Sequence, residues 1–124
     1  MYPYSTEFRP AAPVLVVEFL SLLPGRRIEV LALVDSGSDL TVIPDNIASR
    51  LALNKTGSTA ARGLHGSPSE HSVFSVRVTV RGEETVYARA ITWERDYALL
   101  GRNVLNHWKV VLDGPAAMLS ISQS

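Results

Sequence analysis

The chain has 124 residues, enough for one domain with a core of its own, and its 46% hydrophobic and 19% charged residues exclude a disordered chain. Twelve Lys and Arg residues balance twelve Asp and Glu residues, so no net charge attracts nucleic acid or an anionic membrane. The absence of cysteine excludes disulfides, thiolate catalysis and Cys-ligated metal centres.

Residues 1–12 are polar, aromatic and proline-containing, and we expect them to form an N-terminal arm ahead of a single domain over residues 13–124. This beginning has no basic segment followed by an apolar stretch, so it does not resemble a secretory signal. No apolar run reaches the roughly 20 residues that a membrane span needs. We therefore expect a cytoplasmic protein without a membrane contact.

The apolar run PVLVVEFLSLL begins at Pro13 and ends at the turn signal Pro24-Gly25, and Arg26–Val34 follows as the second strand of a hairpin. After an Asp-Ser-Gly-Ser turn, the residues LTVI form a short strand. Pro44 is then expected to open a short helix in PDNIASRLAL, because proline suits the first helical turn.

The next segment, TAARGLHGSPSEHS, is rich in Gly, Ser and Pro and lies between extended stretches. FSVRVTVRGEETVYARAITW alternates apolar and polar residues on both sides of Arg81-Gly82, which predicts a second hairpin. ALLGRNVLNHW passes from strand to short helix at Gly101, and WKVVLDGPAAMLSIS supplies two more strands. The sum predicts a mainly β fold, a small barrel or sandwich with one or two short helices.

The turn Asp35-Ser36-Gly37-Ser38 carries the chemical signal. Taken alone, it is typical of any strand-ending turn, since Asp, Ser and Gly all favour turns. Its flank adds information, because the apolar residues before Asp35 deliver the carboxylate from a buried strand. Gly37 also lets backbone approach a carboxylate or a substrate closely.

Together, LALVDSGSDLTVIP and the later LLGRNVLNHW resemble the retropepsin-like aspartic proteases, the family of retroviral proteases and their cellular and bacterial relatives. The resemblance extends from about Pro13 to Ile121. It implies an all-β acid-protease fold, a retropepsin-like closed barrel that is one half of the active enzyme. Between the two motifs, ARGLHGSP is similar to the flap hairpin that closes over substrate in that family.

The resemblance also implies roles for individual residues. Asp35 is the expected catalytic aspartate, with the Ser36 hydroxyl bonding across to a partner loop and Gly37 lying against the aspartate and the substrate backbone. Asp39 and Arg102 match a family pair that braces the active-site loop. The expected substrate-binding residues are Ser38, Asp39, Arg62, Gly63, Leu64, His65 and Gly66, and the expected structural supports are Leu99, Leu100, Gly101 and Arg102. No metal or cofactor is implied, and because the flap is more polar than retroviral tips, substrate preference is not carried over.

Hydrolysis of a peptide bond without a metal or a covalent intermediate needs one group to activate water and another to protonate the carbonyl oxygen. Two adjacent carboxyls that share a proton can do both. Because the chain contains a single Asp-Ser-Gly, we expect a homodimer in which Asp35 of each chain meets on the two-fold axis and an extended polypeptide is cut. In the family, chain termini pair across the dimer, so AAMLSISQS and the arm are expected to do so here.

Other functions are weighed against this one. His65, His71 and His107 lack the spacing and the accompanying carboxylates of a metal site, and no Gly-x-Ser-x-Gly motif supports a serine hydrolase. Trp93 and Trp108 are expected to pack in the core or an interface. The remaining alternative is a catalytically silent retropepsin fold that serves as a dimerisation or peptide-binding module.

Overall fold

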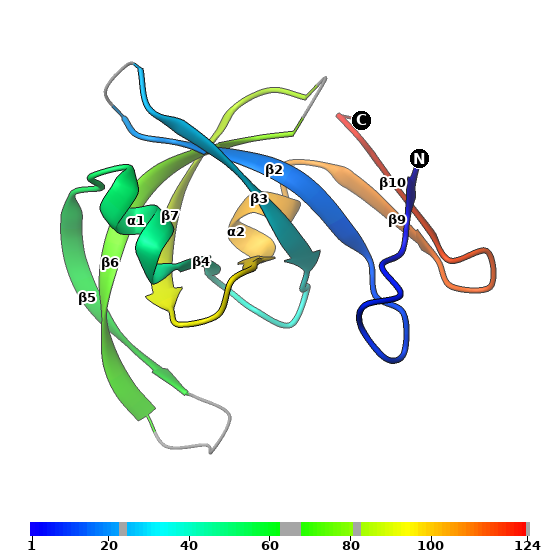
Figure 1. Ribbon diagram of the computed structural model, residues 1–124, viewed down its shortest axis with the longest axis horizontal. Helices are drawn as coiled ribbons and strands as arrows, with labels where there is room; N and C mark the ends of the chain where they lie inside the picture. The colour runs from blue at the N-terminus through cyan, green and yellow to red at the C-terminus, as the bar shows by residue number, and fades with distance from the viewer. Residues whose placement is uncertain (23–24, 63–67, 81–82, 124) are drawn as a thin grey trace.

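The computed structural model describes residues 1–22, 25–62, 68–80 and 83–123, except for the side chains of residues 60–62 and 68–69. Six strands close into a barrel, which confirms the mainly β fold (Figure 1). In spatial order they are β2 (Val14–Leu20), β3 (Arg27–Val34), β8 (Ala98–Leu100), β4 (Thr41–Pro44), β7 (Val86–Trp93) and β6 (Pro68–Thr79), and β6 pairs back to β2.

Both predicted hairpins are present, the first from an apolar run that ends at a turn signal and the second from alternating apolar and polar residues. β2 pairs antiparallel with β3, and β6 pairs antiparallel with β7. Along β2, Leu15, Val17 and Phe19 are buried while Val16 between them is 56% exposed. This alternation sends every second side chain into the barrel interior, where it packs against the other strands.

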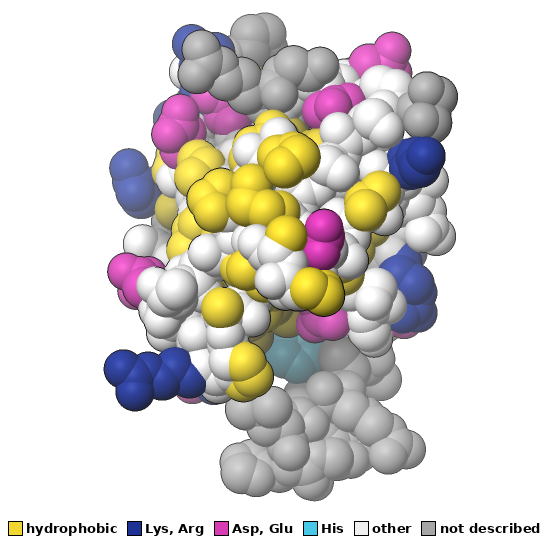
Figure 2. Space-filling view, turned by 90° about the vertical axis from the view of Figure 1, so that its right-hand side faces the viewer, with side chains coloured by type: hydrophobic (Ala, Val, Ile, Leu, Met, Phe, Trp, Pro, Cys, Tyr) yellow, Lys and Arg dark blue, Asp and Glu magenta, His cyan; other side chains and the backbone are white. Residues whose placement is uncertain are grey.

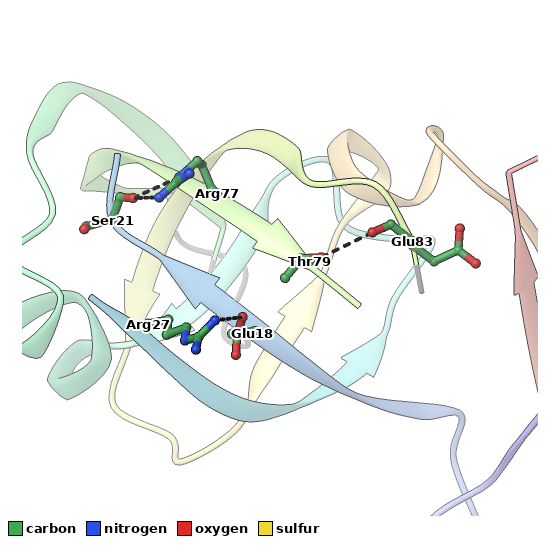
Figure 3. Close-up of polar contacts among 6 residues, drawn as sticks. All are labelled: Glu18, Ser21, Arg27, Arg77, Thr79 and Glu83. Atoms are coloured by element: carbon green, nitrogen blue, oxygen red, sulfur yellow. Dashed lines mark hydrogen bonds and ion pairs between the residues drawn. The ribbon is translucent and has the colours of Figure 1, made fainter. Parts of the chain in front are cut away.

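The barrel closes where the end of β2 meets the end of β6. The backbone pairs there are Glu18 with Thr79, Phe19 with Val78 and Leu20 with Arg77. The Arg77 guanidinium extends this seam, because Nε and Nη2 both donate to the Ser21 carbonyl, at 2.9 and 2.7 Å (Figure 3). The seam therefore holds two segments together that are more than 50 residues apart in the chain.

Two short helices cover the barrel, as predicted. α1 (Asp45–Arg50) begins one residue later than expected, since Pro44 is still the last residue of β4 and serves as the N-cap. α2 (Arg102–Leu105) begins directly after Gly101 and buries Val104 and Leu105. No helix in the described ranges is long and apolar enough to cross a membrane.

Strand β5 (Lys55–Arg62) was expected only as an extended stretch ahead of the hairpin ARGLHGSP, and its bounds were not predicted. Its sequence, KTGSTAAR, has no large apolar residue, so hydrophobic periodicity gives no signal. The strand forms because its backbone pairs with β6, from Lys55 opposite Phe74 to Arg62 opposite Pro68. The resulting hairpin projects from the barrel (Figure 1).

The two termini form a separate sheet, in the order β1 (Tyr2–Pro3), β10 (Met118–Ser122), β9 (Lys109–Asp113). β10 is the central strand of this sheet and pairs with β1 and β9 of its own chain, and the expected pairing of the termini across a dimer stays a prediction. β1 lies within residues 1–12, so part of the expected N-terminal arm is a strand of this sheet. Leu119 of β10 is fully buried, which anchors the sheet to the barrel core.

Candidate active site

Asp35 directly follows Val34, the last residue of β3. Its backbone N–H donates to the Leu100 carbonyl at 3.0 Å, so the residue is anchored to β8. Its side-chain Oδ1 accepts the Gly37 N–H at 3.0 Å, which is the bond by which an aspartate folds the following turn. The carboxylate is thereby held in one orientation while the residue stays partly exposed.

Gly37 is needed because the turn is tight. A Cβ atom at this position would lie 3.1 Å from the Asp35 Oδ1 atom, closer than most real contacts of that kind. Any side chain would therefore push on the carboxylate that the Gly37 N–H holds. The requirement for glycine at this point of the sequence motif has a direct geometric cause.

Residues at the β8–α2 junction contact the Asp35 turn. Gly101 lies against the backbone of Leu40, and the next residue, Arg102, donates its N–H to the Ser38 carbonyl at 2.7 Å. The Arg102 side chain reaches further, since Nη1 donates to the Ser36 carbonyl at 2.7 Å. Two segments that are more than 60 residues apart are thus joined around the Asp35 turn.

The expected pairing of Asp39 with Arg102 is absent among the residues that the structure describes. Asp39 is exposed, and its carboxylate makes no ion pair with Arg102 there. The guanidinium instead donates to the Ser36 carbonyl. Arg102 therefore holds the turn by a hydrogen bond to the backbone of Ser36 and not by an ion pair with a carboxylate.

Thr41 and Asn103 form a support that sequence reasoning missed. The fully buried Thr41 hydroxyl donates to Asn103 Oδ1 at 2.9 Å and accepts the Gly101 N–H at 3.2 Å. Asn103 Nδ2 donates in turn to the Arg89 carbonyl on β7, at 2.7 Å. The signal in the sequence was a single polar residue within the otherwise apolar run LTVIP, since a buried hydroxyl needs a partner.

Thr41→Val keeps the size of the side chain but removes this hydroxyl. The Gly101 N–H and the Asn103 Oδ1 atom then lose their hydrogen-bond partner, and we expect the free energy of unfolding to fall by about 1–3 kcal/mol. Urea unfolding followed by circular dichroism measures the change. Thr92→Val on β7 is the matched control, because no hydrogen bond of the Thr92 side chain is described; equal effects of the two substitutions would contradict the role of Thr41.

The other predicted site residues are placed as follows. The Ser38 hydroxyl donates to the Leu40 carbonyl at 2.6 Å, so it stiffens the turn. Leu100 is fully buried beneath the turn, and Leu99 is half-buried. Arg62 is the last residue of β5, but its side chain and the residues Gly63, Leu64, His65 and Gly66 lie outside the described part of the chain. The flap residues therefore stay a prediction.

A sequence profile described as aspartyl protease matches residues 24–104, more than half of the chain, including the Asp-Ser-Gly motif and the start of the later motif up to Val104. No curated protein sequence matches. Among solved structures, the chain is similar to the EIAV protease complexed with the inhibitor HBY-793 (22% identity, TM-score 0.61, covering 77% of this chain and 86% of that one). It is also similar to the simian foamy virus (mac) protease (21% identity, TM-score 0.56, covering 76% and 92%). A third match is the foamy viral protease-reverse transcriptase in complex with an RNA/DNA hybrid (22%, TM-score 0.58), of which the chain spans only 12%.

Proposed function

Because the chain belongs to the retropepsin-like aspartyl protease family, we propose that it is an aspartic endopeptidase that works as a homodimer. The observation that carries the proposal is the Asp35 turn. Its carboxylate is oriented by the Gly37 N–H, and its backbone is held by Leu100 and Arg102. Rigid placement of a partly exposed carboxylate is what general acid–base chemistry requires.

One Asp35 supplies only half of the chemistry. In the proposed dimer the two Asp35 carboxyls lie side by side and share one proton, because two like charges at that distance do not both ionise. The ionised carboxylate takes a proton from the attacking water, and the protonated carboxyl donates its proton to the carbonyl oxygen of the peptide bond. A single Asp-Ser-Gly in the sequence supports the requirement for a second chain.

The terminal sheet offers an apolar surface for that second chain. Val111 and Leu112 of β9 are 45% and 51% exposed, and Met1 beside β1 is 82% exposed. Figure 2 shows hydrophobic side chains gathered on the face of the molecule that lies to the right in Figure 1, where this sheet is. Apolar side chains gathered on one face, as Figure 2 shows, are typical of a contact surface, and the zero net charge opposes no self-association.

The β5–β6 hairpin supports the choice of substrate. It extends from the barrel on the side where the Asp35 turn also lies (Figure 1). In the proposed enzyme an extended polypeptide lies with its backbone between this hairpin and the two Asp35 turns. Extended chains suit such a cleft because their backbone groups remain free to pair.

The proposal is tested with purified protein and a peptide library between acid and neutral pH. The expected result is cleavage that a transition-state inhibitor of aspartic proteases blocks and that depends on protein concentration as the dimer does in a sizing experiment. Binding of peptides without any cleavage would favour the silent binding module instead. Cleavage by a species that remains monomeric at every concentration would overturn the homodimer.

Arg102→Ala removes the hydrogen bond from the guanidinium to the Ser36 carbonyl. We expect kcat/KM for peptide cleavage to fall roughly tenfold, the value of one such bond, with a weaker dimer as an accompanying effect. Steady-state kinetics and sedimentation measure the two quantities. Arg50→Ala at the exposed end of α1 is the control, and an Arg102→Ala variant with an unchanged rate and an unchanged dimer constant would contradict the role of Arg102.

A further inference from the structure

The part of the arm between Ser5 and Ala12 is an ordered loop. Ser5 and Ala12 exchange two backbone hydrogen bonds, at 2.8 and 3.1 Å, and these close the loop at its base. The Glu7 N–H donates to the Ser5 hydroxyl at 3.2 Å. One residue after the loop, the Pro13 carbonyl accepts the N–H of Val34, which is the residue before Asp35. The base of the loop is therefore fixed beside the candidate catalytic turn.

The loop carries one aromatic side chain, and that side chain contacts another part of the chain. The rings of Phe8 and Tyr97 meet edge to face, with their centroids 5.3 Å apart at 87°. Tyr97 meets Trp93 in the same way, at 5.2 Å and 76°, and the Trp93 Nε1–H donates to the Tyr97 carbonyl at 2.7 Å. Arg95 lies over the Trp93 ring, 5.6 Å from its centroid. Trp93 and Tyr97 thus form a fixed aromatic pair with Phe8 against it.

Tyr97 of this aromatic pair precedes the short strand β8, whose last residue contacts Asp35. Tyr97 directly precedes β8, and β8 runs parallel to β3, so both strands lead into the candidate site. At their ends the Leu100 carbonyl accepts the Asp35 N–H. Figure 1 shows the arm loop, the Asp35 turn and the loop between β7 and β8 along the same lower edge of the barrel. The contact from Phe8 to Tyr97 therefore links the arm loop to the loop between β7 and β8.

Burial of Phe8 does not serve the hydrophobic core. The core cluster and the residues that pack against it include Tyr2 and Tyr4 of the arm but neither Phe8 nor Tyr97. Phe8 is only partly buried, and its neighbours Glu7 and Arg9 are exposed. The Phe8 ring thus lies against Tyr97 near the surface, in a position that an aromatic side chain of a separate peptide could also take.

We propose that Trp93 and Tyr97 form a binding site for an aromatic side chain of a peptide, and that Phe8 of the chain's own arm occupies this site as an internal competitor. The inference rests on the proposed function, because it names the substrate class and the regulation of the same site. A short tether gives Phe8 an effective concentration on the order of millimolar, which a free peptide has to exceed. Edge-to-face geometry accepts Phe, Tyr or Trp from another chain equally well.

Phe8→Ala tests the competition in the full chain. For a peptide substrate with an aromatic residue, we expect KM to fall roughly two- to tenfold, as loss of one ring contact allows, while kcat is unchanged. Arg9→Ala, in the same loop but without a ring, should leave both constants unaltered. An unchanged or raised KM in the Phe8→Ala variant would overturn the inference, and a substrate with alanine in place of its aromatic residue should show no gain.

A second measurement separates this inference from the peptidase itself. The probe is a synthetic peptide with the sequence of residues 5–12, STEFRPAA, and its variant with alanine for phenylalanine. In the Asp35→Asn background, added Phe8→Ala should strengthen binding of the first peptide only, and Tyr97→Ala should remove that gain. If Phe8→Ala strengthens binding of the first peptide but the wild type cleaves no peptide, the proposed peptidase is refuted and the internal competitor stands. If the wild type cleaves peptides but the Phe8→Ala variant binds both peptides equally, the internal competitor is refuted and the peptidase stands.

Discussion

Replacing Asp35 with Asn should reduce peptide cleavage by at least roughly 10³-fold, while the fold and the dimer persist. An amide can neither take the proton of the attacking water nor share a proton with the partner carboxyl, and general acid–base groups contribute about 10²–10⁴-fold each. The Asn side chain has the same shape, and its Oδ1 can still accept the Gly37 N–H that now lies 3.0 Å from Asp35 Oδ1. Loss of activity with an intact turn would separate chemistry from structure.

Steady-state cleavage, circular dichroism and sedimentation give the three quantities that this substitution separates. Asp45→Asn is the matched control, because Asp45 is an exposed carboxylate at the start of α1 and asparagine is well tolerated near a helix N-terminus. Cleavage at the wild-type rate by the Asp35→Asn variant would refute the assignment. Loss of the dimer in the same variant would instead point to a structural role for Asp35.

Mixing the wild type with the Asp35→Asn variant tests whether one site is made by two chains. If each site needs both Asp35 carboxyls, mixed dimers are inactive, and activity falls with the square of the wild-type fraction. If each chain works alone, activity falls in proportion to that fraction. The two curves differ most at intermediate ratios, so a titration at constant total protein distinguishes them.

The local parts of the fold followed from the sequence because their causes are local. Apolar residues in PVLVVEFL and in FSVRVTV alternate because successive side chains point into the barrel and away from it. Gly101 marked the change from strand to helix. Periodicity did not predict the bounds of β5, because its residues are polar or small and only pairing with β6 makes it a strand. Backbone pairing within this hairpin needs no apolar alternation in β5, so it leaves no periodic signal there.

The candidate site also combines features with local causes, which the sequence reveals, and contacts with other segments, which it does not. The Asp35 turn was visible in the sequence, since Asp, Gly and an apolar flank have local causes. Its supports join segments about 60 residues apart: Thr41 with Asn103, and Ser36 with Arg102. Asn103 was seen only as part of a motif, and Arg102 was assigned to the wrong partner group, because one sequence does not reveal which backbone carbonyl a side chain reaches. The contact of Phe8 with Tyr97 likewise has no local signal.

Gly101→Ala should destabilise the protein strongly, because Gly101 has no room for a side chain. An added Cβ atom would overlap the Leu40 carbonyl oxygen and lie 2.5 Å from its carbon and 2.9 Å from the Ser38 oxygen. These are backbone atoms, and they cannot rotate away as a flexible side chain can. We expect the free energy of unfolding to fall by about 3 kcal/mol, the upper end of the usual cost of overpacking. Gly114→Ala is the matched control, because no atom lies within 4 Å of a Cβ built there.

The same substitution also indicates how closely the stability of the barrel and the geometry of the site are linked. To admit the methyl group, the backbone from Ser38 to Leu40 must move away from β8, and the Gly101 N–H then moves away from the Thr41 hydroxyl. Asp35 begins that turn, so its carboxylate moves with it. Under conditions where the variant is still folded, kcat/KM should therefore fall by more than 10²-fold, since small displacements of a catalytic group are costly. Calorimetry and single-turnover cleavage measure the two effects, and a Gly101→Ala variant that is as stable and as active as Gly114→Ala would show that the turn does not depend on this contact.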